Sequence, residues 1–144
     1  MRTALLLACL SLGACAGGPP ADGPQPLVLL AQETYSLAKA PRRELLRDAE
    51  AWSKLWGEVQ DMRRLAPPVD FERQMVLFAA LGERRTGGYA IAIVRAEVVE
   101  GTLVVHVRET APAPGAIRTM ALTAPLHAVM VPRNDLPVRW FTVP

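Results

Sequence analysis

The sequence is short of cysteine. Its 144 residues include two, Cys9 and Cys15, and both lie within the first fifteen positions. No disulfide can therefore cross-link the rest of the chain, which must hold its fold through a hydrophobic core. Hydrophobic residues make up 51% of the sequence. That proportion suits one packed domain of this length and argues against wholesale disorder.

Charge of one sign is not concentrated anywhere in the sequence. The chain carries 16 basic and 14 acidic residues, and no run of basic residues is longer than a pair. Proteins that bind nucleic acid usually carry a basic stripe or block. We therefore do not expect a nucleic acid partner.

Residue types that perform catalysis or bind metals are scarce after residue 15. The serines there, Ser36 and Ser53, lie outside any G-x-S-x-G motif. The two histidines, His106 and His127, stand on separate predicted strands, point away from the apolar face, and have no other ligand at metal-binding spacing. We therefore expect no metal site, no cofactor and no catalytic residue.

Carboxylates are the remaining catalytic candidates. Five lie on or beside predicted strands: Asp70, Glu72, Glu97, Glu100 and Glu109. We interpret them as solvated charges that protect strand edges from sticking to other chains. A hydrolase stays open as an alternative, because a glycosidase-like pair depends on a spatial separation that the sequence does not give.

The N-terminus carries the sharpest local signal. A short positive start precedes a nearly unbroken apolar run at residues 4–12, which has signal-peptide length and is too short to span a bilayer. It ends in Leu12-Gly13-Ala14-Cys15, which resembles the lipobox of bacterial lipoproteins. An earlier candidate ending at Cys9 leaves too short an apolar run before it. We predict a signal peptide at residues 1–14 and lipidation of Cys15.

Acyl chains on Cys15 would anchor the protein to a bacterial membrane without spanning it. If the host has an outer membrane, Ala16 lacks the aspartate that often marks retention at the inner membrane. Residues 16–26 read AGGPPADGPQP, in which seven of eleven residues are glycine or proline. We interpret residues 15–26 as the lipidated cysteine and a tether that reaches roughly 30 Å.

One amphipathic helix is predicted after residue 47. Asp48 can cap its first turn, because a carboxylate accepts the free amides there. Four apolar residues then recur with helical spacing on one face: Trp52, Leu55, Trp56 and Val59. Pro67-Pro68 requires the helix to have ended by that point.

The rest of the domain is predicted to be strands. Residues 75–81 are continuously apolar, which is typical of a strand covered on both faces. Residues 89–99 and 103–107 alternate around a Glu100-Gly101 hairpin turn. Shorter strands are predicted at residues 27–31, 35–39, 43–46, 126–131 and 138–143.

One helix and roughly six to eight strands predict an α+β, mainly β fold. We expect a single domain over residues 27–144, built as an antiparallel sandwich or curled sheet with the helix covering one side or one open end. Parallel crossovers are not expected, because they usually need a helix and only one is present.

Motifs in the second half resemble a known family. Gly82 is followed by Thr86-Gly87-Gly88-Tyr89, and later by Pro114-Gly115 and Thr123-Ala124-Pro125. This order resembles the C-terminal domain of the protease complex subunit PrcB, over about residues 70–132. The resemblance implies a non-catalytic lipoprotein module, whose name-giving member associates with a surface protease and supports its maturation or stability.

The expected function is therefore that of an envelope lipoprotein that binds another envelope protein through loops on a rigid scaffold. The family resemblance implies a surface protease as that partner. Two alternatives stay open: a protease inhibitor, and a small-ligand-binding lipoprotein whose pocket would be lined by Trp52, Trp56, Trp140 and Phe141. The predicted partner-binding loops contain Arg84, Arg85, Thr86, Gly87, Gly88, Tyr89, Pro112 and Pro114.

Lipidation at Cys15 is directly testable. Cys15→Ser should abolish incorporation of labelled palmitate and move the protein from the detergent phase to the aqueous phase, because the acylated thiol is gone. Cys9→Ser is the matched control and should label like the wild type. Labelling that follows Cys9 instead would contradict the predicted cleavage site.

Overall fold

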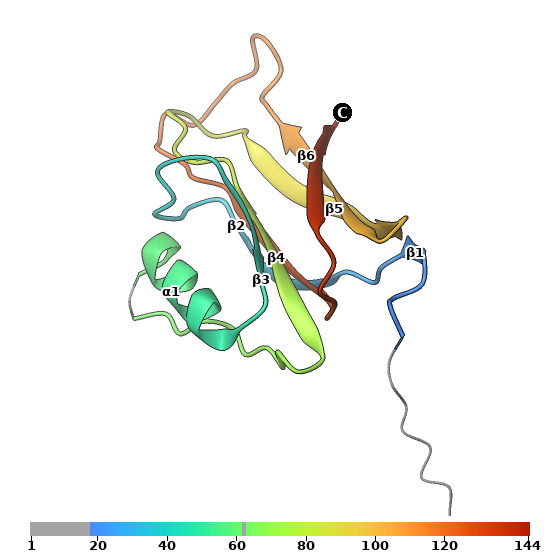
Figure 1. The fold of residues 1–144 in the computed structure, drawn as a ribbon. Helices are drawn as coiled ribbons and strands as arrows, with labels where there is room; N and C mark the ends of the chain where they lie inside the picture. Colours follow the sequence, from blue (N-terminus) through green and yellow to red (C-terminus); the bar gives the residue numbers. More distant parts are fainter. Residues whose placement is uncertain (1–17, 62) are drawn as a thin grey trace, which may run out of the picture.

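The computed structural model describes residues 18–61 and 63–144, and arranges them as two four-stranded sheets and one helix (Figure 1). The predicted signal peptide and Cys15 lie outside the described residues. Within the described ranges, no helix is long and apolar enough to cross a bilayer. The elements are β1 (Gly23–Pro24), β2 (Val28–Glu33), β3 (Arg42–Leu46), α1 (Ala49–Val59), β4 (Gln74–Ala80), β5 (Ala90–Val99), β6 (Thr102–Thr110), β7 (Leu126–Pro132) and β8 (Val138–Val143).

The two sheets lie face to face, and α1 covers the free face of one of them (Figure 1). The middle sheet has the order β2-β7-β4-β3 and packs between α1 and the outer sheet, which has the order β1-β5-β6-β8. The predicted mainly β sandwich with one covering helix is thereby confirmed.

One pair of strands is parallel, contrary to the expectation from the sequence. β8 pairs with β6 in parallel register, whereas every other strand pair is antiparallel. The chain leaves β6, runs through β7 in the middle sheet, and returns to the outer sheet as β8. A strand in the facing sheet therefore supplies the crossover that usually needs a helix.

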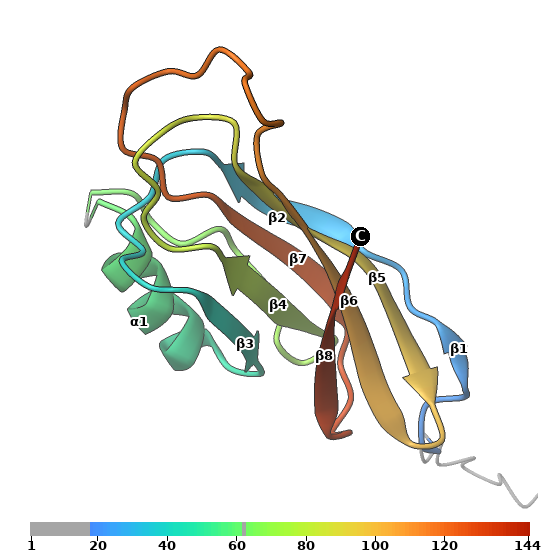
Figure 2. The ribbon, with the colours of Figure 1, turned by 90° about the horizontal axis from the view of Figure 1, so that it is seen from above.

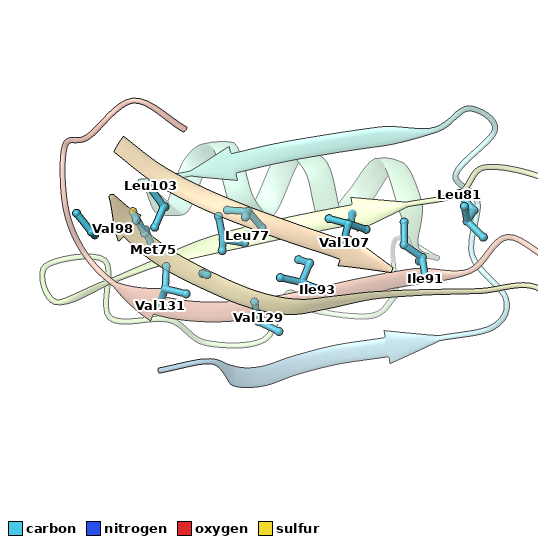
Figure 3. Close-up of a cluster of buried hydrophobic side chains, with 13 residues drawn as sticks. Met75, Leu77, Leu81, Ile91, Ile93, Val98, Leu103, Val107, Val129 and Val131 are labelled. Atoms are coloured by element: carbon cyan, nitrogen blue, oxygen red, sulfur yellow. The ribbon is translucent and has the colours of Figure 1, made fainter. Parts of the chain in front are cut away.

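β4 is the most buried strand, as its continuous apolar sequence predicts. Successive side chains of a strand point to opposite faces, so Met75, Leu77 and Ala79 enter the core between the sheets (Figure 3). The alternate residues enter a second core beneath α1: Val76, Phe78 and Ala80. All six side chains are at most 2% exposed.

Helix α1 begins where the sequence indicates. The Asp48 side chain accepts a hydrogen bond from the Ala51 amide at 2.7 Å, which satisfies one of the free donors of the first turn. The buried face is the predicted stripe: Trp52, Leu55, Trp56 and Val59. The indole N–H groups donate to carbonyl oxygens of the segment after the helix, from Trp52 to Pro67 at 2.9 Å and from Trp56 to Arg64 at 3.0 Å.

Two segments differ from the sequence expectation. The predicted strand at residues 35–39 is wrong: the segment is irregular, and its backbone groups bond instead to helix α1 and to another loop. The Leu37 amide donates to the carbonyl of Val59, the last residue of α1, at 2.8 Å, and the Lys39 carbonyl accepts from the Glu83 amide at 3.3 Å. Ordered pairing also starts before residue 27, because Gly23 and Pro24 pair with the end of β5. Proline is tolerated there because β1 is an edge strand.

Gly82 lies at a close approach between two loops. Its φ is +72°, and an added Cβ would lie 2.6 Å from the Ala40 carbonyl carbon. Gly101 in the hairpin turn shares the φ of +72° but has no atom within 4 Å of that position. A comparison of substitutions at the two glycines thus separates the effect of backbone strain from that of steric clash.

We expect Gly101→Ala to lower the free energy of unfolding by about 1 kcal/mol, the cost of placing a Cβ in the left-handed region. Gly82→Ala should lower it by roughly 1–3 kcal/mol more, because backbone atoms must also move apart. Urea unfolding followed by tryptophan fluorescence measures both. Equal losses for the two variants would contradict the close approach at Ala40.

Candidate functional site

Three connectors meet at one end of the sandwich, which we call the loop end (Figure 2). They are residues 34–41 between β2 and β3, residues 81–89 between β4 and β5, and residues 111–125 between β6 and β7. Each connector leaves one strand and enters the next at this end, because the two strands that it joins run in opposite directions. The predicted partner-binding residues all lie in the second and third connectors.

The second and third connectors are hydrogen-bonded to each other. The backbones of Arg84 and Thr123 exchange two bonds, at 2.7 and 2.9 Å. The Thr123 hydroxyl, which is buried, donates to the Thr86 carbonyl at 2.9 Å, and the Gly87 amide donates to the Thr119 carbonyl at 2.9 Å. The two loops therefore act as one body.

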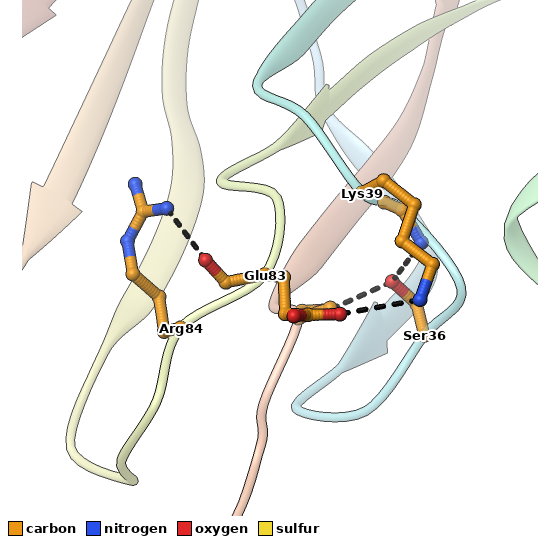
Figure 4. Close-up of polar contacts among 6 residues, drawn as sticks. Ser36, Lys39, Glu83 and Arg84 are labelled. Atoms are coloured by element: carbon orange, nitrogen blue, oxygen red, sulfur yellow. Dashed lines mark hydrogen bonds and ion pairs between the residues drawn. The ribbon is translucent and has the colours of Figure 1, made fainter.

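The first connector joins the same network (Figure 4). The Ser36 hydroxyl donates to the Ala124 carbonyl at 2.7 Å, and the Ala124 amide donates to the Thr34 carbonyl at 3.0 Å. The Lys39 ammonium pairs with the Glu83 carboxylate at 3.2 Å. Ser36 is thus a residue that fixes loop structure.

One of the two consecutive glycines of the predicted site is explained by its conformation and close packing. Gly88 has φ +88°, and a Cβ there would lie 2.8 Å from the Pro112 Cβ, so only glycine admits both the conformation and the approach. A Cβ on Gly87 would lie 3.4 Å from the Thr119 Cβ, which is close to an ordinary van der Waals contact. The structure therefore brings Gly87 and Gly88 against the loop that contains Pro112, while Pro114 is exposed at its tip.

Tyr89 is partly a core residue and partly a loop residue. It is half-buried and packs against the core between the sheets. The Arg84 guanidinium lies over its ring, with the central carbon 5.7 Å from the ring centroid. Such a cation–π contact holds the arginine near one orientation.

The exposed apolar side chains of the loop end were not predicted from the sequence. Of the eleven large hydrophobic residues exposed in the described chain, five lie in the three connectors: Tyr35 at 61%, Leu37 at 53%, Ile117 at 104%, Met120 at 85% and Leu122 at 60%. A usable signal was present, because residues 116–122 hold apolar side chains without strand alternation in a segment flanked by proline and glycine.

The charge of the loop end is mostly basic. Its connectors contain four basic residues and one acidic residue, and the acidic one, Glu83, is the partner of Lys39. Arg84, Arg85 and Arg118 have no ion-pair partner among the described residues.

The two histidines occupy different environments: His106 is partly packed, as the sequence indicates, whereas the expectation for His127 is wrong. His106 is half-buried on the outer sheet, where its Nε2 lies 3.1 Å from the Glu97 carboxylate and its ring stacks on Phe141. His127 does not face solvent: it is 7% exposed, and its Nδ1 accepts a hydrogen bond from the Ile93 amide at 3.2 Å. Ile93 adjoins a register shift in β5, so the imidazole satisfies an amide at the bulge.

The acidic candidates are spread over the fold. Glu97 pairs with Arg95 and His106, Glu109 pairs with Arg43, and Asp70 lies 3.8 Å from Arg73. Among the described residues, no group of three or more histidine, cysteine, aspartate or glutamate residues is placed to hold a metal ion.

The candidate lining of a small-ligand pocket does not come together. Trp52 and Trp56 lie in the core beneath α1, whereas Trp140 packs against the core between the two sheets and Phe141 is exposed on the outer sheet. A hollow of about 460 Å³ lies at the other end of the molecule and is lined by residues 18–20 and 133–136.

Comparison with known proteins supports the family resemblance. Residues 75–132 match the family model described as PrcB C-terminal. The match covers β4 to β7, and with them the second and third connectors. No curated protein and no solved structure matches the chain.

The burial of His127 predicts that the free energy of unfolding depends on pH. Burial lowers the pKa of its imidazole below 6.5, and protonation of Nδ1 would also break the bond from Ile93. As pH falls below about 6.5 the unfolded chain takes up the proton first, so the free energy of unfolding should fall, by at most about 1.4 kcal/mol per pH unit, until the folded pKa is reached.

Urea unfolding at pH 7.5 and 5.0 measures this effect. His127→Gln, whose amide oxygen can still accept from Ile93, should lose less stability on acidification than the wild type. His106→Gln, which removes the chain's other histidine, is the matched control and should retain the wild-type loss. An unchanged loss in His127→Gln would contradict the assignment.

Proposed function

We propose that this protein is an exported, lipid-anchored and non-catalytic module, whose loop end binds another envelope protein as the accessory subunit of a surface protease. The observation that carries the proposal is the set of five exposed apolar side chains on the three connectors. Exposed apolar side chains gathered at one site, rather than scattered singly, are typical of protein-binding surfaces.

The loops are suited to binding because they are held in place. The three connectors hydrogen-bond to one another and are fixed to the sandwich where β2, β4 and β6 end. A surface that is ordered before binding loses less conformational entropy in the complex. Burying Ile117, Met120 and Leu122 against a partner should therefore stabilise the complex, by about 25 cal/mol per Å² of apolar area removed from water.

The position of the N-terminal segment favours an outward-facing loop end. The Asp22 carboxylate accepts a hydrogen bond from the Glu100 amide at 3.3 Å, and Gly23 pairs with Val98. These contacts place the start of the described chain at the β5–β6 hairpin, at the end of the sandwich opposite the loop end (Figure 2). Acyl chains on Cys15 would hold the hairpin end toward the membrane.

The family match supports a role in a protease complex. It spans two of the three connectors and the strands that hold them, so the part of the chain that resembles PrcB is the part that presents the surface. The absence of catalysis is proposed on the same basis, together with the structural roles that Ser36 and His127 play in the fold.

Site-specific photo-crosslinking in intact cells tests this function. A photoreactive phenylalanine analogue at Ile117 or Met120 should give a covalent adduct with an envelope protein, because both side chains are exposed at the loop end. The matched control is the same analogue at Val99, which is 43% exposed near the opposite end. No protein adduct at either loop position, or equal adducts at Val99, would overturn the proposal.

A further inference from the structure

We infer that the loop end recognises an acidic protein surface, in which carboxylates surround apolar side chains. The inference rests on the proposed function and specifies the chemistry of the partner. Its basis is a charge imbalance: the three connectors carry a net charge of +3 from four basic residues and one acidic residue, whereas the whole chain carries only +2. All the remaining residues together are therefore slightly acidic.

Nearby acidic residues do not neutralise this charge. Glu83 pairs with Lys39, Glu109 with Arg43, and Glu33 with Arg64. These three carboxylates thus already have basic partners of their own. The three arginines of the loop end have none among the described residues, so their charge is available to a partner.

The arginine side chains are partly held in position by the loops themselves. One terminal nitrogen of Arg84 donates to the Glu83 carbonyl at 3.0 Å, and one of Arg118 donates to the Ala113 carbonyl at 3.3 Å. A guanidinium has five N–H donors, so each retains donors for a carboxylate. Arg85, which follows Arg84 in the sequence, is also exposed.

Charged and apolar groups alternate within the same loop. Arg118 lies between Ile117 and Met120 in sequence, and all three are exposed. A partner that buries the apolar side chains must therefore place groups beside the guanidinium. Carboxylates suit this position, because arginine binds them in a planar, two-bonded geometry, and burying an unpaired arginine would cost free energy.

An anionic membrane could offer similar chemistry, but the geometry favours a protein. The loop end and the N-terminal segment lie at opposite ends of the molecule (Figure 2). The intervening strands β5 and β6 are ten and nine residues long, or about 30 Å at ~3.3 Å per residue. A membrane that holds Cys15 would thus face the other end of the sandwich.

The test uses the full-length lipidated protein, with the photoreactive analogue at Ile117, in isolated envelopes. The variant combines Arg84→Gln, Arg85→Gln and Arg118→Gln, which removes charge but keeps polar side chains of similar length. The matched control combines Arg95→Gln, Arg108→Gln and Arg139→Gln, three exposed arginines of the outer sheet. Circular dichroism confirms that both variants fold.

We expect the loop-end variant to lose roughly tenfold or more of the protein adduct, and the control variant to keep wild-type yield. Raising NaCl from about 50 to 500 mM should reduce the wild-type adduct and affect the loop-end variant much less, because salt screens the charges that the variant lacks. Mass spectrometry should place the cross-linked site within a stretch of the partner rich in aspartate and glutamate.

Three results would overturn the inference. They are an adduct of unchanged yield in the loop-end variant, a cross-linked stretch that is neutral or basic, and an adduct to phospholipid instead of protein. The first two leave the proposed function intact, since a partner is still bound at the loop end. Only the lack of any protein adduct in the wild type would reject both.

Discussion

The burial of β4 on both faces is the constraint on which the rest of the structure depends. Its alternate side chains belong to two separate cores, one between the sheets and one beneath α1. A strand with no polar face requires a layer on each side, because a single uncovered face would leave Val76 and Phe78 or Met75 and Leu77 in water. The outer sheet provides one layer and the tryptophan stripe of α1 provides the other.

The layered arrangement also determines where the chain can present a surface. Both faces of the middle sheet are covered, so the connectors between strands lie at the two ends of the sandwich. Three of them gather at one end. Threonine, serine and glycine residues there serve mainly to lock the loops together: Thr123 to Thr86, Ser36 to Ala124, and Gly88 against Pro112. The motif that carries the family resemblance is thus a structural one, and it supports a surface formed by neighbouring side chains.

Polar residues inside the domain follow the same logic. His127 was expected to point away from the apolar face, yet it lies buried and accepts a hydrogen bond from the Ile93 amide. An amide left without a partner at a bulge would cost about as much as a lost hydrogen bond, and the imidazole offsets that cost. His127 therefore has a structural role, although histidine is a residue type that often acts in catalysis.

The sequence by itself determined the elements that depend on local periodicity. The helix with its Asp48 cap, the doubly buried β4 and the Glu100-Gly101 hairpin could all be predicted, because spacing and turn chemistry act within a few residues. Only the tertiary structure decided the parallel pairing of β8, the irregular path of residues 35–39, the burial of His127, and the convergence of the three connectors at the loop end. Each depends on contacts between residues far apart in the chain, and strand alternation does not specify which strands become neighbours or where loops converge.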